Sequence, residues 1–129
     1  MAASRMRSPL SRAIGLGSAK AGAEHWWAQR VTALALVPLA VWFVIAIIEL
    51  AGADRALFVD WVRQPVPAVL LELLLIATFY HGALGLQVVI EDYVENETLR
   101  FGLLIVMRLA AIVFAARGIF AVLKLSLGA

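Results

Sequence analysis

The chain has 129 residues, of which 64% are hydrophobic and 16% are charged. A soluble domain of this size is about half apolar and roughly a quarter charged, so we expect the additional apolar residues to face lipid or other membrane helices. The absence of cysteine excludes disulfides, thiolate metal sites and covalent attachment of a c-type haem. Motifs for nucleophilic catalysis and phosphate binding are missing. We therefore expect a membrane subunit with no catalytic activity of its own and no nucleic-acid partner.

The N-terminal segment, residues 1–30, is basic. It carries one acid, Glu24, and five basic residues, which are Arg5, Arg7, Arg12, Lys20 and Arg30. The apolar run that follows is longer than the core of a signal peptide, which is roughly 7–15 residues, and it lacks a small-residue cleavage site. We predict a retained cytoplasmic arm over 1–30, followed by a transmembrane anchor domain over 31–129.

Three apolar stretches make up the anchor domain, at about 31–51, 67–90 and 101–127. Each exceeds the about 20 residues that a helix needs to cross a hydrocarbon core of roughly 30 Å. Backbone groups in lipid must pair within their own segment, which favours helices. The sequence thus predicts an all-α membrane protein with three transmembrane helices. Pro38 is expected to kink the first helix or to remove one of its hydrogen bonds.

The connections between the helices predict their arrangement. The segment ADRALFVDWVRQPVP is expected to be a loop in which Trp61 anchors the chain at the membrane interface. The next connection, EDYVENETLR, is short, so the helices on either side of it are expected to be antiparallel neighbours. Basic residues concentrate on the cytoplasmic side of membrane proteins, and the N-terminal arm carries five of them, more than either connection. The N-terminus is therefore predicted to be cytoplasmic, as is the second connection.

His81 lies deep within the second apolar stretch. An ionisable residue at membrane depth is costly and often functional. Three roles stay open from the residues alone: a hydrogen bond between helices, worth about 0.6 to 2 kcal/mol, proton transfer, or metal ligation through one ring nitrogen. Gly82 and Gly85 would admit a neighbouring helix or a flat haem. The chain has no second histidine at membrane depth, so a haem with two histidine ligands would require a partner subunit.

Asp92 and Tyr93 follow where this apolar run ends. With about 100° and 1.5 Å per residue, Asp92 lies within roughly 20° of the His81 face and about 16 Å further along the axis. One helix face is therefore expected to present an imidazole at mid-membrane and an acid near the cytoplasmic surface. A solvated helix end and an interfacial aromatic residue would give the same pattern.

The start of the first helix, HWWAQR, is also consistent with two interpretations. The tryptophans fit an interfacial belt from which Arg30 reaches the headgroups. Alternatively, His25 and Arg30 are cationic donors suited to carboxylates such as haem propionates. Of the other intramembrane charges, Arg108 and Arg117 are expected to form structural pairs. For Glu72 two alternatives stay open: it pairs with a cation of a partner subunit, or it extends to the membrane surface.

The segments HWWAQRVTALALVPL and HGALGLQVVIEDY, set in three apolar stretches behind a basic arm, resemble the hydrophobic membrane anchor subunits of bacterial succinate dehydrogenase, of the alphaproteobacterial type. The resemblance covers residues 22–125. It implies half of a haem-binding helix bundle, completed by a second anchor of the cytochrome b type. It also implies flavoprotein and iron–sulfur subunits on the cytoplasmic side of the bacterial inner membrane, and a place in respiratory electron transport and the tricarboxylic acid cycle.

The resemblance also implies roles for individual residues. His81 matches an axial ligand of haem b, with the second ligand from the cytochrome b-type anchor. Tyr93 matches the tyrosine that hydrogen-bonds ubiquinone, and Asp92 the acid beside it. Arg30 and His25 match basic residues near the haem propionates. Two alternatives stay open: the anchor of a fumarate reductase-type complex, and a small transporter or assembly subunit without haem.

Overall fold

Helices account for nearly all of residues 18–128, the part of the chain that the computed structural model describes. They are α2 (Ser18–Glu49), α3 (Arg55–Arg63), α4 (Pro65–Tyr93) and α5 (Glu97–Ser126). Helices α2, α4 and α5 are long and apolar enough to cross a membrane. This confirms the prediction of an all-α protein with three transmembrane helices. Most of the predicted cytoplasmic arm lies outside the described residues, and the orientation stays a prediction.

Helix α2 begins well before the apolar run that was predicted to span the membrane. It starts at Ser18 and continues without a break past Pro38. The polar segment HWWAQR is therefore helical and extends the transmembrane helix at its N-terminal end. Helical periodicity then brings residues three and four apart onto one face. His25, Gln29 and Thr32 have this spacing and form a polar face in the N-terminal half of α2.

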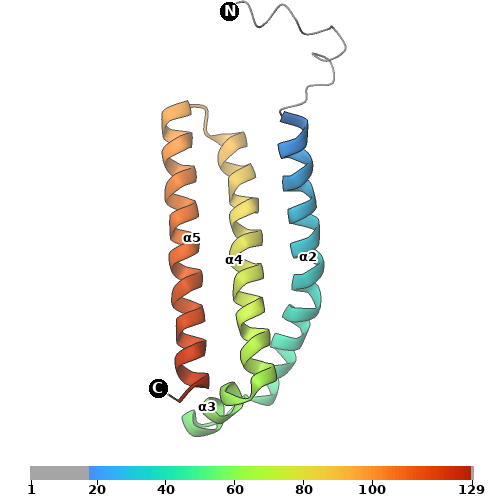
Figure 1. Cartoon of the computed structure of the whole chain (residues 1–129), viewed down its shortest axis with the longest axis vertical. Coiled ribbons are helices and arrows are strands. Elements are labelled where there is room, and N and C mark those ends of the chain that lie inside the picture. Colours follow the sequence, from blue (N-terminus) through green and yellow to red (C-terminus); the bar gives the residue numbers. More distant parts are fainter. Residues whose placement is uncertain (1–17, 129) are drawn as a thin grey trace, which may run out of the picture.

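Helices α4 and α5 form an antiparallel pair that packs along its length (Figure 1). The connection is short because Asn96 caps α5, its side-chain oxygen accepting the Leu99 N–H at 3.0 Å. The pair packs closely at Gly118, where an added Cβ would lie 3.0 Å from Cδ1 of Leu75. The prediction of antiparallel neighbours is confirmed.

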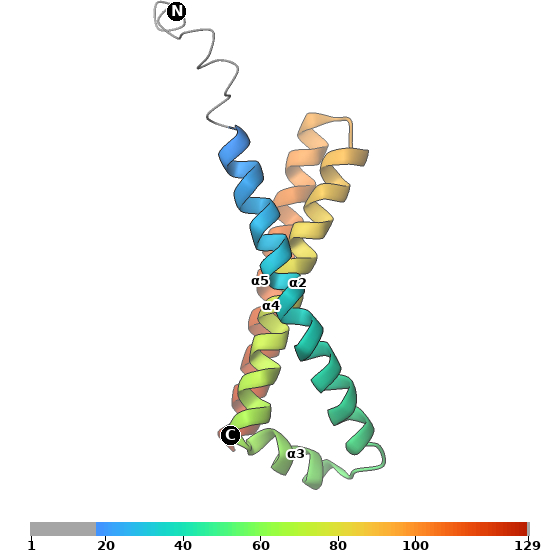
Figure 2. The same cartoon turned by 90° about the vertical axis from the view of Figure 1, so that its right-hand side faces the viewer.

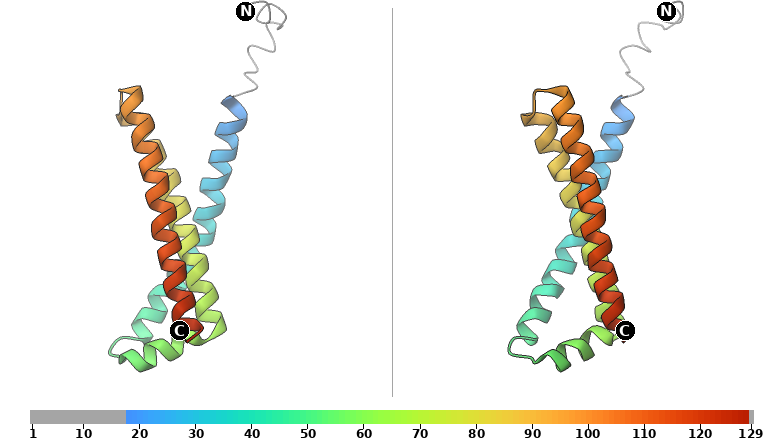
Figure 3. Two further views of the ribbon diagram at one scale, coloured as in Figure 1. Left: turned by 60° about the vertical axis from the view of Figure 1, so that its left-hand side comes forward. Right: turned by 90° about the vertical axis from the view of Figure 1, so that its left-hand side faces the viewer.

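Helix α2 crosses this pair at an angle. In Figure 2 it passes the α4–α5 pair near the middle and diverges from it toward both ends, and Figure 3 shows the same crossing from other sides. Helix α2 packs against α4, whereas within residues 18–128 its backbone does not come close to that of α5. The middle of α4 is therefore the place where side chains from two of the long helices meet.

The connection predicted as a loop contains α3, so that prediction was wrong. Asp54 caps this helix by accepting the Leu57 N–H at 2.8 Å. Val62 is only 1% exposed because α3 packs against α4 and α5. Trp61 stacks on Trp42 of α2, with ring centres 6.0 Å apart and an angle of 16° between the planes. A short amphipathic helix thus closes one end of the bundle (Figure 1).

The three long helices bury very little of their apolar surface against one another. Among the described residues, the buried hydrophobic side chains are Ala46, Val62 and Val122. Large apolar residues along all three spans stay exposed. Such a surface requires lipid or further membrane subunits to cover it.

Candidate functional site

His81 meets Thr32 where α2 crosses α4. Nδ1 of the imidazole and Oγ1 of the hydroxyl are 2.9 Å apart, a hydrogen bond between residues 49 positions apart in the sequence. Both side chains are partly buried, and both lie near the middle of their helices. The predicted membrane-depth histidine is thus held through one ring nitrogen by the neighbouring helix.

The second ring nitrogen of His81 is free for an external group. In the described part of the chain, the buried nitrogen and oxygen atoms that lack a partner are His25 Nε2 and Gln29 Oε1. His81 Nε2 also has no hydrogen-bond partner there, and since it is not among the buried atoms, it keeps accessible surface. A neutral imidazole bound through Nδ1 and open at Nε2 is the arrangement that metal-ligating histidines commonly have.

The two glycines after His81 have different surroundings. A Cβ added at Gly82 would have nothing within 4 Å, whereas a Cβ at Gly85 would lie 3.9 Å from Nε2 of Gln29. Gly85 therefore faces α2, and Gly82 leaves open space beside the histidine. A flat macrocycle or a partner helix could approach through this open space, and the haem stays a prediction.

The polar face of α2 continues from Thr32 toward the N-terminus. Gln29 is one turn away from Thr32, and His25 is one turn further. Their unpartnered buried atoms, Gln29 Oε1 and His25 Nε2, leave two polar groups to be satisfied from outside the described chain. Our sequence analysis missed Gln29 and Thr32. The spacing of His25, Gln29 and Thr32 on one helical face was the signal that could have indicated them.

Arg30 lies on a different face of α2. Its guanidinium carbon is 5.2 Å from the centre of the Trp26 ring, which is a cation–π contact. Two residues correspond to about 200° around a helix, so Arg30 points away from the side on which Thr32 meets His81. Within this chain the structure does not bring Arg30 together with His81.

Asp92 and Tyr93 lie at the exposed end of α4. The helix is continuous from Pro65 through Tyr93, so Asp92 keeps the position on the His81 face that periodicity predicts. Both side chains are exposed, Tyr93 by 82%, and neither forms a hydrogen bond within residues 18–128. The acid and the phenol are therefore available to a ligand or a partner subunit.

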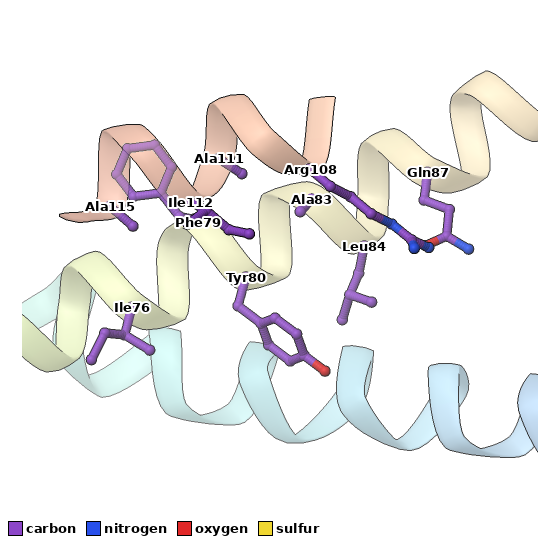
Figure 4. A pocket seen from close by; sticks show the side chains of 10 residues that line it. All are labelled: Ile76, Phe79, Tyr80, Ala83, Leu84, Gln87, Arg108, Ala111, Ile112 and Ala115. Atoms are coloured by element: carbon purple, nitrogen blue, oxygen red, sulfur yellow. The ribbon is translucent and has the colours of Figure 1, made fainter. Parts of the chain in front are cut away.

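An apolar groove of about 450 Å³ runs between α4 and α5 (Figure 4). Phe79, Tyr80 and Ile112 are among the residues that line it. At one end, Nη2 of Arg108 donates to Oε1 of Gln87 at 2.9 Å, and Nε2 of Gln87 donates to Glu91 at 2.8 Å.

Arg108 therefore has a side-chain partner among the described residues, the neutral amide of Gln87, and forms no ion pair there. Glu72 is half-buried and Arg117 is exposed, and neither has an ion pair within the described residues. The structural pairing expected for Arg117 and the two alternatives for Glu72 stay predictions.

The described residues contain no group of three or more histidine, cysteine, aspartate or glutamate side chains that could hold a metal ion. A metal at His81 would therefore need further ligands that this part of the chain does not provide. A haem would need only His81 from this part of the chain, since its macrocycle would supply most of the other ligands.

Comparison with known proteins gives consistent matches. A family model described as succinate dehydrogenase/fumarate reductase transmembrane subunit matches residues 4–116. The succinate dehydrogenase hydrophobic membrane anchor subunit of Rickettsia bellii (strain RML369-C) is 34% identical over 116 residues, covering 90% of this chain and 93% of the relative. The subunit of the same name from Paracoccus denitrificans is 30% identical over 125 residues, covering 97% and 96%. No solved structure matches the chain.

Proposed function

Because the chain belongs to the family of succinate dehydrogenase and fumarate reductase transmembrane subunits, we propose that it holds a haem b together with a second anchor subunit and contributes to ubiquinone reduction. Within the oxidoreductase complex it is a non-catalytic membrane anchor. The observation that carries the proposal is the arrangement of His81, bonded to Thr32 through Nδ1 and accessible at Nε2.

His81 is the proposed axial ligand in this chain. When bound, a b-type haem accepts and passes single electrons within the membrane. The chain's other histidine, His25, lies seven residues before Thr32, about 10 Å away along α2 toward its N-terminal end, and no ligand role is proposed for it. The second axial histidine is assigned to the cytochrome b-type anchor, and the exposed apolar faces of the spans provide surface for that partner.

Tyr93 and Asp92 are the proposed ubiquinone contacts. Reduction of a quinone to a quinol consumes two electrons and two protons, so the site requires a hydrogen-bond donor and access to water. The Tyr93 hydroxyl can donate to a quinone carbonyl, and Asp92 beside it can pass protons from solvent. Their exposure at the end of α4, about 16 Å along the axis from His81, supports this division of roles.

His25 and Arg30 are proposed to lie near the haem propionates, and the structure supports the two residues unequally. His25 has an unpartnered buried nitrogen on the polar face of α2 that leads to Thr32. Arg30 packs on Trp26 on another face and would have to leave that ring to reach a propionate. His25 is therefore the better supported of the two.

The proposed direction of the reaction is succinate oxidation. The family description covers both succinate dehydrogenase and fumarate reductase. The relatives described above carry the name succinate dehydrogenase, which favours that direction over fumarate reduction. We accordingly propose assembly with iron–sulfur and flavoprotein subunits at the cytoplasmic face of the bacterial inner membrane.

The direct test is the haem content per flavin of the complex purified from membranes that carry His81→Ala. We expect most of the b-type haem to be lost while the flavin and iron–sulfur subunits are retained. Gln64→Ala is the control, since it changes an exposed residue at the start of α4, 17 positions before His81, and it is expected to keep the haem. An unchanged haem spectrum in His81→Ala, or a colourless wild-type complex that lacks flavin and iron–sulfur partners, would contradict the proposal.

A further inference from the structure

The hydroxyl hydrogen of Thr32 is committed to its own helix. Oγ1 lies 2.6 Å from the carbonyl oxygen of Ala28 and 3.2 Å from that of Gln29. Both carbonyls are acceptors, so the short contact to Ala28 requires the single hydroxyl hydrogen. Toward His81, the hydroxyl therefore offers only lone-pair density.

This arrangement determines which nitrogen of His81 carries the proton. Nδ1 lies 2.9 Å from a Thr32 oxygen that can only accept, so Nδ1 must be the donor. A neutral imidazole protonated at Nδ1 has its free lone pair at Nε2, the nitrogen that has no partner in residues 18–128. The opposite tautomer would carry a hydrogen at Nε2 and could not bind a metal there.

Thr32 is also suited to fixing the direction of the ring. Threonine is restricted about χ1 because it is branched at Cβ, and the bond to Ala28 restricts it further. The contact lies where α2 crosses α4, so the hydroxyl is held by the packing of two helices (Figure 2). A rigid acceptor on one nitrogen orients the lone pair on the other.

We propose that Thr32 is a positioning residue that holds His81 in its Nδ1-protonated form and aims Nε2 at the haem iron. The inference rests on the proposed haem ligation and adds a residue outside the coordination sphere to it. Acceptors of this kind make a ligand histidine more basic, and their loss commonly costs about 10- to 100-fold in metal affinity. Thr32 of α2 would thus raise the affinity of His81 of α4 for the haem iron.

The test compares Thr32→Val with Thr32→Ser in the purified complex. Valine keeps the branched shape and removes the acceptor, whereas serine keeps the hydroxyl. For Thr32→Val we expect haem transfer to apomyoglobin to be faster by about tenfold or more and the haem midpoint potential to rise, because a less basic imidazole stabilises the ferric form less. Thr32→Ser, which keeps the hydroxyl but loses the branch at Cβ, is expected to lie close to wild type and well away from Thr32→Val in both measurements.

Two outcomes would overturn the inference while leaving the proposed function intact. In the first, Thr32→Val has the haem midpoint potential and the haem release rate of wild type, while His81→Ala loses its haem. The other is equal impairment in Thr32→Val and Thr32→Ser, which would indicate a packing role for the side chain. If His81→Ala itself keeps its haem and spectrum, the ligand proposal fails, and the inference about Thr32 fails with it.

Discussion

Arg108 of α5 donates a hydrogen bond of 2.9 Å to the side-chain carbonyl of Gln87 on α4. The bond joins two adjacent spans and satisfies a guanidinium that would otherwise lie unpaired among apolar side chains at the end of the groove (Figure 4). We expect Gln87→Leu to lower the stability of the complex by about 1–3 kcal/mol, because it removes a hydrogen bond to a charged group within a membrane-spanning helix. Thermal unfolding of the purified complex measures this loss.

A double-mutant cycle separates this pairing from simple packing. Arg108→Leu combined with Gln87→Leu is expected to be less destabilising than the sum of the two single variants, since the double variant no longer leaves the guanidinium without its acceptor. Gln64→Leu is a suitable control, because the exposed Gln64 side chain makes no capping hydrogen bond. Additive effects of the two single variants would show that the bond contributes nothing.

The role of Tyr93 can be tested with the chain's own second tyrosine as a control. Tyr93→Phe removes the proposed donor to the quinone carbonyl. Loss of one hydrogen bond in the transition state, worth about 1.4 kcal/mol, should lower succinate:ubiquinone reductase activity roughly tenfold. Succinate oxidation by an artificial acceptor should be unchanged. Tyr80→Phe, in the apolar groove, should leave both activities unchanged. Equal loss of both activities in Tyr93→Phe would instead indicate a role in assembly.

Two glycines with open surroundings allow the space beside His81 to be probed. Neither Gly82 nor Gly102 has an atom within 4 Å of an added Cβ, so this chain alone should tolerate a larger side chain at either position. If a haem lies against α4 next to His81, Gly82→Leu will strongly lower the haem content per flavin and Gly102→Leu will not. Haem loss in both variants, or in neither, would contradict a haem beside Gly82.

The predicted orientation can be measured because the chain contains no cysteine. Single cysteines at Ala51→Cys, after α2, and at Glu95→Cys, between α4 and α5, mark opposite ends of the bundle. A membrane-impermeant maleimide applied to spheroplasts should modify the first variant, and the second only after the inner membrane is opened. The reverse labelling pattern would place the N-terminus outside the cytoplasm.

The features that depend on one helix at a time could be predicted from the sequence. Apolar length identifies the three spans, because lipid forces the backbone of each span to pair within itself. The prediction that His81 and Asp92 share one face of α4 follows from helical periodicity alone, because α4 is continuous. Helix α3 could not be predicted in this way, because it is short and depends on a local cap at Asp54 and on burial of Val62.

Features that depend on how helices cross could not be predicted. A single threonine in an apolar helix gives no signal of its own, and only the crossing of α2 over α4 makes Thr32 the partner of His81. For Arg30, the sequence left the aromatic belt and the propionate site open. The structure places its guanidinium over Trp26, a contact set by the choice of rotamer.

The most direct test of the central claim is the spin state of the haem in a His81→Gly complex with and without added imidazole. If His81 supplies the axial nitrogen, removal of its ring leaves the iron five-coordinate and high-spin, or leaves the site depleted of haem. Free imidazole should then restore a low-spin spectrum in a saturable manner. A low-spin spectrum identical to that of wild type in the absence of imidazole would contradict the claim that His81 is the ligand.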